Sequence, residues 1–96
     1  MDDQSKPLKP KELQINIGDE ISRGRYSNSM MVSHSADEFI IDWLLNAPNG
    51  THLLSRIIVS PAHIKRIINT LKGNLDNYEK TYGSIKENAS IDHKYH

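Results

Sequence analysis

Hydrophobic and polar residues alternate along the chain as far as Val59, and a spacing of three and four residues replaces this alternation afterwards. Alternation with a period of two is typical of a strand that buries one face. It predicts four strands, at residues 13–17, 25–34, 38–45 and 52–59. Turn-forming residues at 46–50 separate the last two strands. A brief irregular or helical link at 20–24 would join the first two.

The third and fourth predicted strands are apolar on both faces. One helix can cover only one face of a sheet, and apolar patches of more than a few hundred Å² are rare on soluble monomers. We therefore expect another chain to cover the remaining face, with a second copy of this protein as the first candidate. The candidate interface residues are Ile40, Leu44, Leu54 and Ile58.

The stretch "IIVSPAHIKRII" at 57–68 marks the change from strand to helix. Ser60 is a favourable N-cap, and Pro61 stands at the first helical position, where its missing N–H costs nothing. Gly83 is a natural residue to end the helix. Between them runs an apolar stripe of Ile64, Ile67, Ile68, Leu71, Leu75, Tyr78 and Tyr82. The pattern predicts a helix of about 22 residues, about 33 Å long, and favours a cap over a catalytic role for this stretch.

The elements combine into one small domain at residues 12–85. The predicted class is α+β: an antiparallel sheet of about four strands, followed by one long C-terminal amphipathic helix packed across it. Residues 1–11 and 86–96 are predicted to be a disordered arm and a disordered tail. The start has no apolar signal region, no run approaches the roughly 20 apolar residues of a membrane span, and cysteine is absent. We expect a cytoplasmic protein without a membrane segment.

Nothing in the sequence has the pattern of a catalytic or metal site. Ser33 and His34 are neighbours on a predicted strand, so their side chains would point to opposite faces. We expect His34 to be a hydrogen-bonding residue at a strand end, and Asp42 to pair with Arg56 on the next strand. The two histidines of the final "HKYH" are three positions apart but stand in the predicted tail. We therefore expect no enzymatic activity, no cofactor and no metal.

Residues 23–29, "RGRYSNS", are the best candidate for a surface that contacts a partner or a nucleic acid. They combine two arginines, a glycine and an aromatic ring that could stack on a base. The candidate contact residues are Arg23, Arg25, Tyr26 and Asn28. The alternative is a polar strand entrance with Tyr26 half-buried. Twelve basic residues balance twelve acidic ones, so no overall charge directs the chain toward nucleic acid.

Two stretches carry a resemblance to a known family: "ELQINIGDEISRGRYSNSMMVSHSADEFIIDW" at 12–43 and "SRIIVSPAHIKRIINTLKGNLDNYEKTYGSI" at 55–85. Together they resemble a family of short, uncharacterised bacterial proteins catalogued as a domain of unknown function. The family has no established activity or catalytic residues. Its members are often encoded beside the large RNA polymerase subunits, so the resemblance implies a transcription-associated role, such as that of an accessory subunit.

Two functions follow as expectations. The first is a non-catalytic protein-interaction module that docks on a larger bacterial assembly, with RNA polymerase as the best candidate. The second is a homodimeric protein that binds single-stranded nucleic acid. Small units of four strands and a helix, the PUR-type repeats, dimerise and bind single strands with this element order, although no sequence match links them to this chain.

Overall fold

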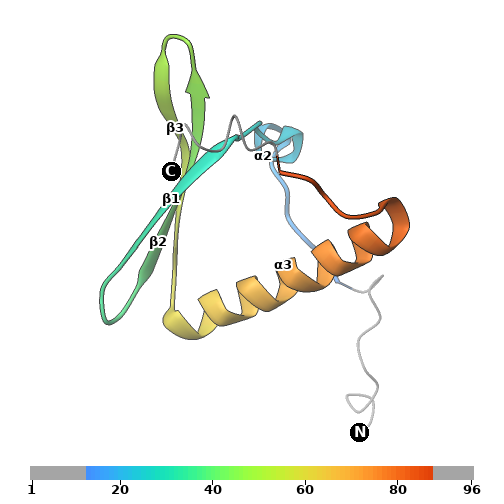
Figure 1. Ribbon diagram of the computed structural model, residues 1–96. Helices are drawn as coiled ribbons and strands as arrows, with labels where there is room; N and C mark the ends of the chain where they lie inside the picture. The colour runs from blue at the N-terminus through green and yellow to red at the C-terminus, as the bar shows by residue number, and fades with distance from the viewer. Residues whose placement is uncertain (1–12, 88–96) are drawn as a thin grey trace, which may run out of the picture.

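The computed structural model describes residues 13–87 and confirms the α+β class. A short helix comes first, then an antiparallel sheet, then a long helix (Figure 1). The elements are α2 (Asp19–Arg23), β1 (Ser29–His34), β2 (Phe39–Ala47), β3 (Gly50–Val59) and α3 (Pro61–Tyr82). The predicted arm at 1–11 and most of the predicted tail at 86–96 lie outside the described residues.

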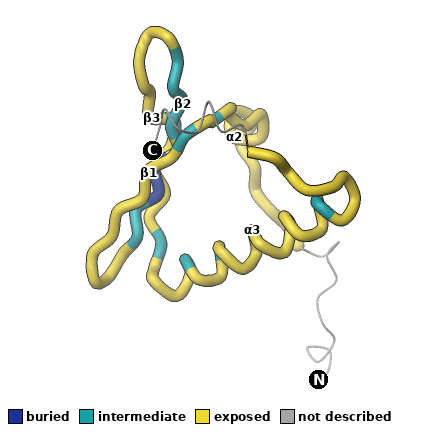
Figure 2. Tube along the Cα trace, viewed as in Figure 1, coloured by how far each residue is buried: buried dark blue, intermediate teal, exposed yellow. Residues whose placement is uncertain are grey.

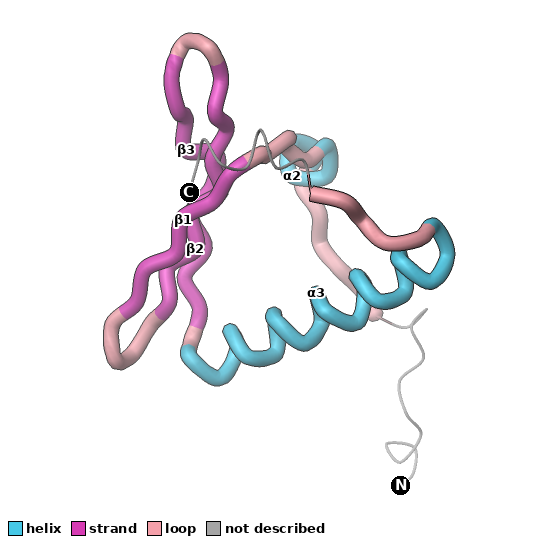
Figure 3. Tube along the Cα trace, viewed as in Figure 1, coloured by secondary structure: helices cyan, strands magenta, loops and turns pink. Residues whose placement is uncertain are grey.

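The sheet has three strands in the order β1-β2-β3, each antiparallel to the next (Figure 3). A two-residue turn, Pro48-Asn49, joins β2 to β3. Gly50 follows it with φ at 128°, a conformation that side chains with a Cβ rarely adopt. The turn predicted at 46–50 is therefore present, although both strands extend further into it than expected.

The strand predicted at 13–17 is not formed. Alternation shows which side chains a strand would bury, but a strand also needs a neighbouring backbone to pair with. Between this segment and β1 lie α2 and Gly24, and Figure 1 shows the chain before α2 running toward α3 rather than along the sheet. Leu13, Ile15 and Ile17 are all exposed. The described sheet therefore has three strands instead of about four.

Helix α3 has the bounds that the sequence predicts. Ser60 is the N-cap, and its Oγ accepts a hydrogen bond from the backbone N–H of His63 at 3.2 Å. Pro61 occupies the first turn, where no intrahelical donor is needed. At the other end Gly83 has φ at 93°, and its N–H donates to the carbonyl of Glu79 at 2.8 Å. Local sequence is sufficient to start and stop this helix.

The predicted packing of the helix across the sheet is wrong. The close contacts between elements are those of β1 with β2 and of β2 with β3. Helix α3 runs away from the end of β3 and leaves an open, three-sided outline (Figures 1 and 2). The Cα radius of gyration is 17.7 Å, against about 11–13 Å for a compact domain of this length. Because Ser60 alone links the two elements, the direction of the first turn decides where α3 lies.

The described residues contain almost no hydrophobic core. Ile41, in the middle of β2, is 5% exposed and is the only buried hydrophobic residue among them. Along α3 only Ile64 and Ile67 of the apolar stripe are half-buried, whereas Leu71 and the rest of the stripe are exposed. Figure 2 shows the single buried patch in the sheet and exposed chain along nearly the whole of α3. The fold thus positions apolar side chains without covering them.

Candidate functional site

The register of the sheet sorts its side chains into two faces. Residues opposite one another in an antiparallel pair share a face. One face, here called the tryptophan face, carries the apolar residues Met30, Val32, Phe39, Ile41, Trp43, Ile57 and Val59, together with His34 and Ser55. The other, the ion-pair face, consists of Met31, Ile40, Asp42, Leu44, Leu53, Arg56 and Ile58. Both faces are rich in large apolar side chains, as the sequence predicts.

Asp42 and Arg56 form a two-pronged ion pair at the centre of the ion-pair face. The Nε of Arg56 donates to Oδ1 of Asp42 at 2.7 Å, and Nη2 donates to Oδ2 at 2.9 Å. The hydrogen bond from Arg56 holds the pKa of Asp42 below its ordinary value, and the positive charge adds to this effect while burial opposes it. The Asp42 side chain is 12% exposed and that of Arg56 is 55% exposed. The predicted cross-strand pair is confirmed, and it accounts for a carboxylate among apolar neighbours.

A β-bulge separates Leu54 from the other candidate interface residues. Trp43 lies opposite Ser55, but the next residue, Leu44, lies opposite Leu53, so β3 has one extra residue here. Leu54 therefore borders the same hollow as Trp43 and Ser55, on the tryptophan face. The predicted grouping of Leu54 with Ile40, Leu44 and Ile58 is wrong, because an extra residue reverses the alternation beyond it. Leu53, which lies opposite Leu44, belongs to the ion-pair face instead.

The segment before β1 is tied to the far end of β2 by side chains. The Ser27 hydroxyl lies 2.7 Å from the carbonyl oxygen of Leu44 and 2.9 Å from that of Ser29. Asn28 makes two hydrogen bonds to the backbone of Asn46: its Oδ1 accepts from the N–H at 2.8 Å, and its Nδ2 donates to the carbonyl at 3.1 Å. The Asn28 amide thus continues the ladder between β1 and β2 beyond its last backbone pair.

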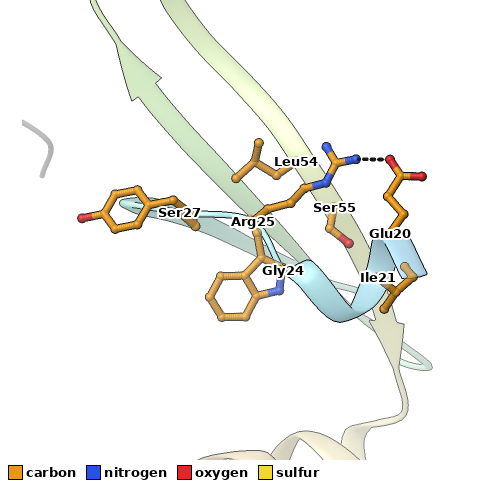
Figure 4. A pocket seen from close by; sticks show the side chains of 9 residues that line it. Glu20, Ile21, Gly24, Arg25, Ser27, Leu54 and Ser55 are labelled. Atoms are coloured by element: carbon orange, nitrogen blue, oxygen red, sulfur yellow. Dashed lines mark hydrogen bonds and ion pairs between the residues drawn. The ribbon is translucent and has the colours of Figure 1, made fainter. Parts of the chain in front are cut away.

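A hollow of about 720 Å³ lies where α2 and this segment meet the sheet (Figure 4). Glu20, Ile21 and Gly24 line it on one side, and Arg25, Tyr26, Ser27, Trp43, Leu54 and Ser55 complete it. In Figure 4 the guanidinium of Arg25 points toward the carboxylate of Glu20, and the two are 3.5 Å apart. Both side chains are largely exposed, so this pair contributes little to stability.

Only two of the four candidate contact residues line the hollow. Arg25 and Tyr26 line the hollow together. Arg23 ends α2 and is not part of the lining, and Asn28 is engaged with Asn46. Tyr26 is 79% exposed, so the alternative that placed it half-buried at a strand entrance is wrong. Sequence reasoning did not place Trp43 in this hollow, because the contact depends on the register of β2 against β3.

The contacts of His34 and His52 stabilise local structure and do not indicate a catalytic or metal site. The ring of His34 lies against Phe39, with centroids 5.3 Å apart, and within residues 13–87 no hydrogen bond of its side chain accompanies this contact. His52 Nε2 lies 3.1 Å from Oδ1 of Asn49 in the hairpin turn. No group of three metal-ligating side chains occurs within residues 13–87. The "HKYH" histidines lie outside the described residues.

Ser33 and His34 point to opposite faces of β1, as the sequence predicts, since their partners on β2 are Ile40 and Phe39. They therefore do not form a nucleophile and base pair.

Helix α3 combines its apolar stripe with many charged residues, and no helix in the described part of the chain is both long and apolar enough to cross a membrane.

Comparison with known proteins identifies a family. Residues 1–87 match the family described as "Protein of unknown function (DUF3467)". The match includes the resemblance seen at 12–85. Among curated proteins no match to the chain is found, and among solved structures there is none either.

Proposed function

The chain belongs to the DUF3467 family, whose function is not established, and we propose that it is a non-catalytic protein-interaction module. It serves as an accessory component that docks on a larger bacterial assembly, with RNA polymerase as the first candidate. The observation that carries the proposal is that Ile41 is the only buried hydrophobic residue in the described part of the chain. A fold with this little core is stable only when another chain covers it.

The exposed apolar residues occur on every element. They include Ile21 on α2, Met31 on β1, Trp43 on β2, Ile58 on β3 and Leu75 on α3. Surface apolar residues that occur singly are ordinary, whereas contiguous patches mark sites where other molecules bind. Since the patches here extend over both sheet faces and one side of α3, binding to other chains accounts for them better than a small-molecule site does.

Two further observations support a docking module over an enzyme. The Asp42 carboxylate is fully engaged by Arg56, which leaves it no free role as an acid or base. The charged groups that line the hollow beside Arg25 and Tyr26 are the exposed ion pair of Arg25 with Glu20, whose nitrogen and oxygen are 3.5 Å apart. The choice of RNA polymerase rests on the gene neighbourhood that the family resemblance implies.

Affinity purification tests the proposal. A tagged chain, expressed at its native level, is isolated after nuclease treatment, and the co-purifying proteins are identified by mass spectrometry. We expect RNA polymerase subunits at a constant ratio to the bait. Ile58→Asp, which places a charge on the ion-pair face, should reduce their recovery at least tenfold. Thr81→Asp, on the exposed surface of α3, is the control and should not.

Loss of the polymerase on nuclease treatment would show that nucleic acid bridges the two. Recovery of the bait without any large assembly would refute the docking function. Equal recovery with Ile58→Asp and with wild type would leave docking in place but exclude the ion-pair face as the contact.

Binding of single-stranded nucleic acid is a second candidate, and the exposure of Tyr26 next to Arg25 favours it. An exposed aromatic ring can stack on an unpaired base, and an arginine next to it in the sequence can contact the phosphate backbone. Such binding should weaken steeply with salt, since each phosphate contact releases counterions. Fluorescence anisotropy with a labelled oligonucleotide tests it: Tyr26→Ala and Arg25→Ala should each weaken binding several-fold, and Lys80→Ala should not. Affinity that is absent at low salt would exclude this function.

A further inference from the structure

We infer that two copies of this chain form a two-fold symmetric dimer in which α3 of each copy lies on the tryptophan face of the other. This inference deepens the proposed function and rests on it, because it names the chain that supplies the missing core. The ion-pair face remains free in the dimer for docking on the larger assembly.

One chain carries two unpartnered surfaces that complement each other. The tryptophan face is a sheet surface without a helix, and the stripe of α3 is a helix surface without a sheet. In a two-fold dimer each surface of one copy meets the other surface of the second copy, so both are covered by a single symmetric contact. An unrelated partner would have to supply a separate match for each surface.

The stripe of α3 is long enough for the sheet surface. The stripe from Ile64 to Tyr82 covers eighteen helical steps, which is about 27 Å at 1.5 Å per residue. Strand β3 has 10 residues, which is about 33 Å at 3.3 Å per residue. The stripe is therefore long enough to cross the apolar part of the tryptophan face, which on β3 consists of Ile57 and Val59.

The exposed area is sufficient for a stable dimer. Eight large side chains of the two surfaces have exposed fractions between 38% and 60%: Met30, Val32, Trp43, Ile57, Ile68, Leu71, Leu75 and Tyr78. They leave roughly 700 Å² per chain, taking about 150–250 Å² for a full large side chain. Two copies then bury about 1,400 Å², within the range of about 1,200–2,000 Å² of stable specific interfaces.

The tryptophan face is a better binding surface for α3 of the second copy than the ion-pair face is, because no charged group lies among its central residues. Ile41 has Val32 and Ile57 as its neighbours across the sheet. On the other face the guanidinium of Arg56, which is 55% exposed, stands at the centre. A helix laid over it would remove a charge from water, which is unfavourable unless further hydrogen bonds compensate. The ion-pair face suits a more polar contact.

The link at Ser60 carries α3 away from the sheet of its own chain. Its side chain bonds to the first turn of α3, and its backbone is extended, with φ −74° and ψ 159°. With this single linking residue α3 leads away from the sheet of its own chain (Figure 1). In this position the stripe of α3 is available to the sheet of a second copy.

Neighbouring isoleucines on opposite faces provide a matched test of the dimer. Ile57 on the tryptophan face and Ile58 on the ion-pair face are 47% and 53% exposed. Light scattering after size-exclusion chromatography should give a dimer for wild type and for Ile58→Asp. Ile57→Asp should shift the mass toward the monomer. A monomeric wild type, or a dimer unaffected by Ile57→Asp, would overturn the inference.

Because Ile57→Asp could also impair folding, engineered disulfides give a second test in a chain that has no natural cysteine. One preparation carries Ile57→Cys and a differently tagged one carries Leu71→Cys. After mixing and mild oxidation we expect cross-links between the two tags, at several times the yield of a Lys72→Cys control. A dimer that forms no such link, or a double variant that links only within one chain, would overturn the arrangement.

Failure of the dimer is distinguishable from failure of the docking function. If wild type is monomeric but still recovers RNA polymerase subunits, the inference is wrong and the proposed function stands. If the dimer and its cross-links form but no large assembly co-purifies, the inferred dimer stands and the proposed docking function is wrong.

Discussion

The effect of replacing Leu71 by alanine distinguishes a helix α3 whose apolar stripe is exposed to solvent from one whose stripe is buried by a second chain. In the isolated chain Leu71 is 60% exposed. Full burial of a leucine side chain contributes about 1.5–3 kcal/mol, so the buried two fifths are worth about 1 kcal/mol. Alanine is the best helix former and returns a few tenths of a kcal/mol. An uncovered α3 therefore predicts a loss of less than about 1 kcal/mol in the free energy of unfolding.

Coverage by a second copy predicts a larger loss. Truncation of a buried leucine to alanine costs about 2–5 kcal/mol, depending on how far the surroundings relax. Since both copies carry the substitution, we expect at least about 4 kcal/mol per dimer. Lys72→Ala is the control, because Lys72 is the next residue along the helix and lies off the apolar stripe. Its replacement should change stability by a few tenths of a kcal/mol.

Urea denaturation followed by circular dichroism measures both variants at two protein concentrations that differ about a hundredfold. A dimer that unfolds together with its dissociation loses about 2.7 kcal/mol of apparent stability over that dilution. We expect wild type to show this dependence. A Leu71→Ala cost below 1 kcal/mol, together with transitions that do not move with concentration, would refute the reasoning that a second chain covers α3.

Three further outcomes follow from individual contacts, all measured as free energies of unfolding by urea at fixed protein concentration. Ser60→Ala removes the side-chain cap of α3 and should cost about 1 kcal/mol, whereas Ser60→Asp should restore it; equal stability of all three would contradict the cap. Asn28→Ala removes two hydrogen bonds to the backbone of Asn46 and should cost about 1–2 kcal/mol; a neutral effect would show that water replaces them. Because Arg56 lowers the pKa of Asp42 in the folded state, the stability from this group is complete above the ordinary aspartate pKa of about 3.9 and is lost as pH falls through the lowered value. In Asp42→Asn the free energy of unfolding should therefore fall less steeply as the pH is lowered through this range. The same pH dependence in this variant and in wild type would argue against the pair.

Features that depend on a few consecutive residues could be predicted from the chain alone. The bounds of α3 follow from Ser60, Pro61 and Gly83, which set the backbone at each end of the helix. The hairpin turn follows from Pro48-Asn49-Gly50. The opposite charges of Asp42 and Arg56 on adjacent strands predict their pairing, but the turn alone would place Asp42 opposite Ser55, and the bulge brings Arg56 into register. In each case the physical cause lies within one turn or one hairpin.

The candidate site was predictable only in part. The polar composition of residues 23–29 indicated a contact surface, and Arg25 and Tyr26 do meet at a hollow. No local signal showed that Asn28 would bond to Asn46, or that Trp43 and Tyr26 would line the same hollow, because each arrangement joins segments about eighteen residues apart. The bulge at Leu54 was equally hidden, since one unpaired residue leaves the pattern of apolar positions almost unchanged.

The tertiary arrangement alone shows that the 13–17 segment stays unpaired and that α3 does not lie on its own sheet. Alternation and helical spacing record which side of an element is apolar, since they depend on backbone geometry within that element. They carry no information on which surface covers that side, because burial is a relation between distant segments or between chains. The apolar patterns of this protein are therefore readable residue by residue, while the identity of what buries them depends on assembly.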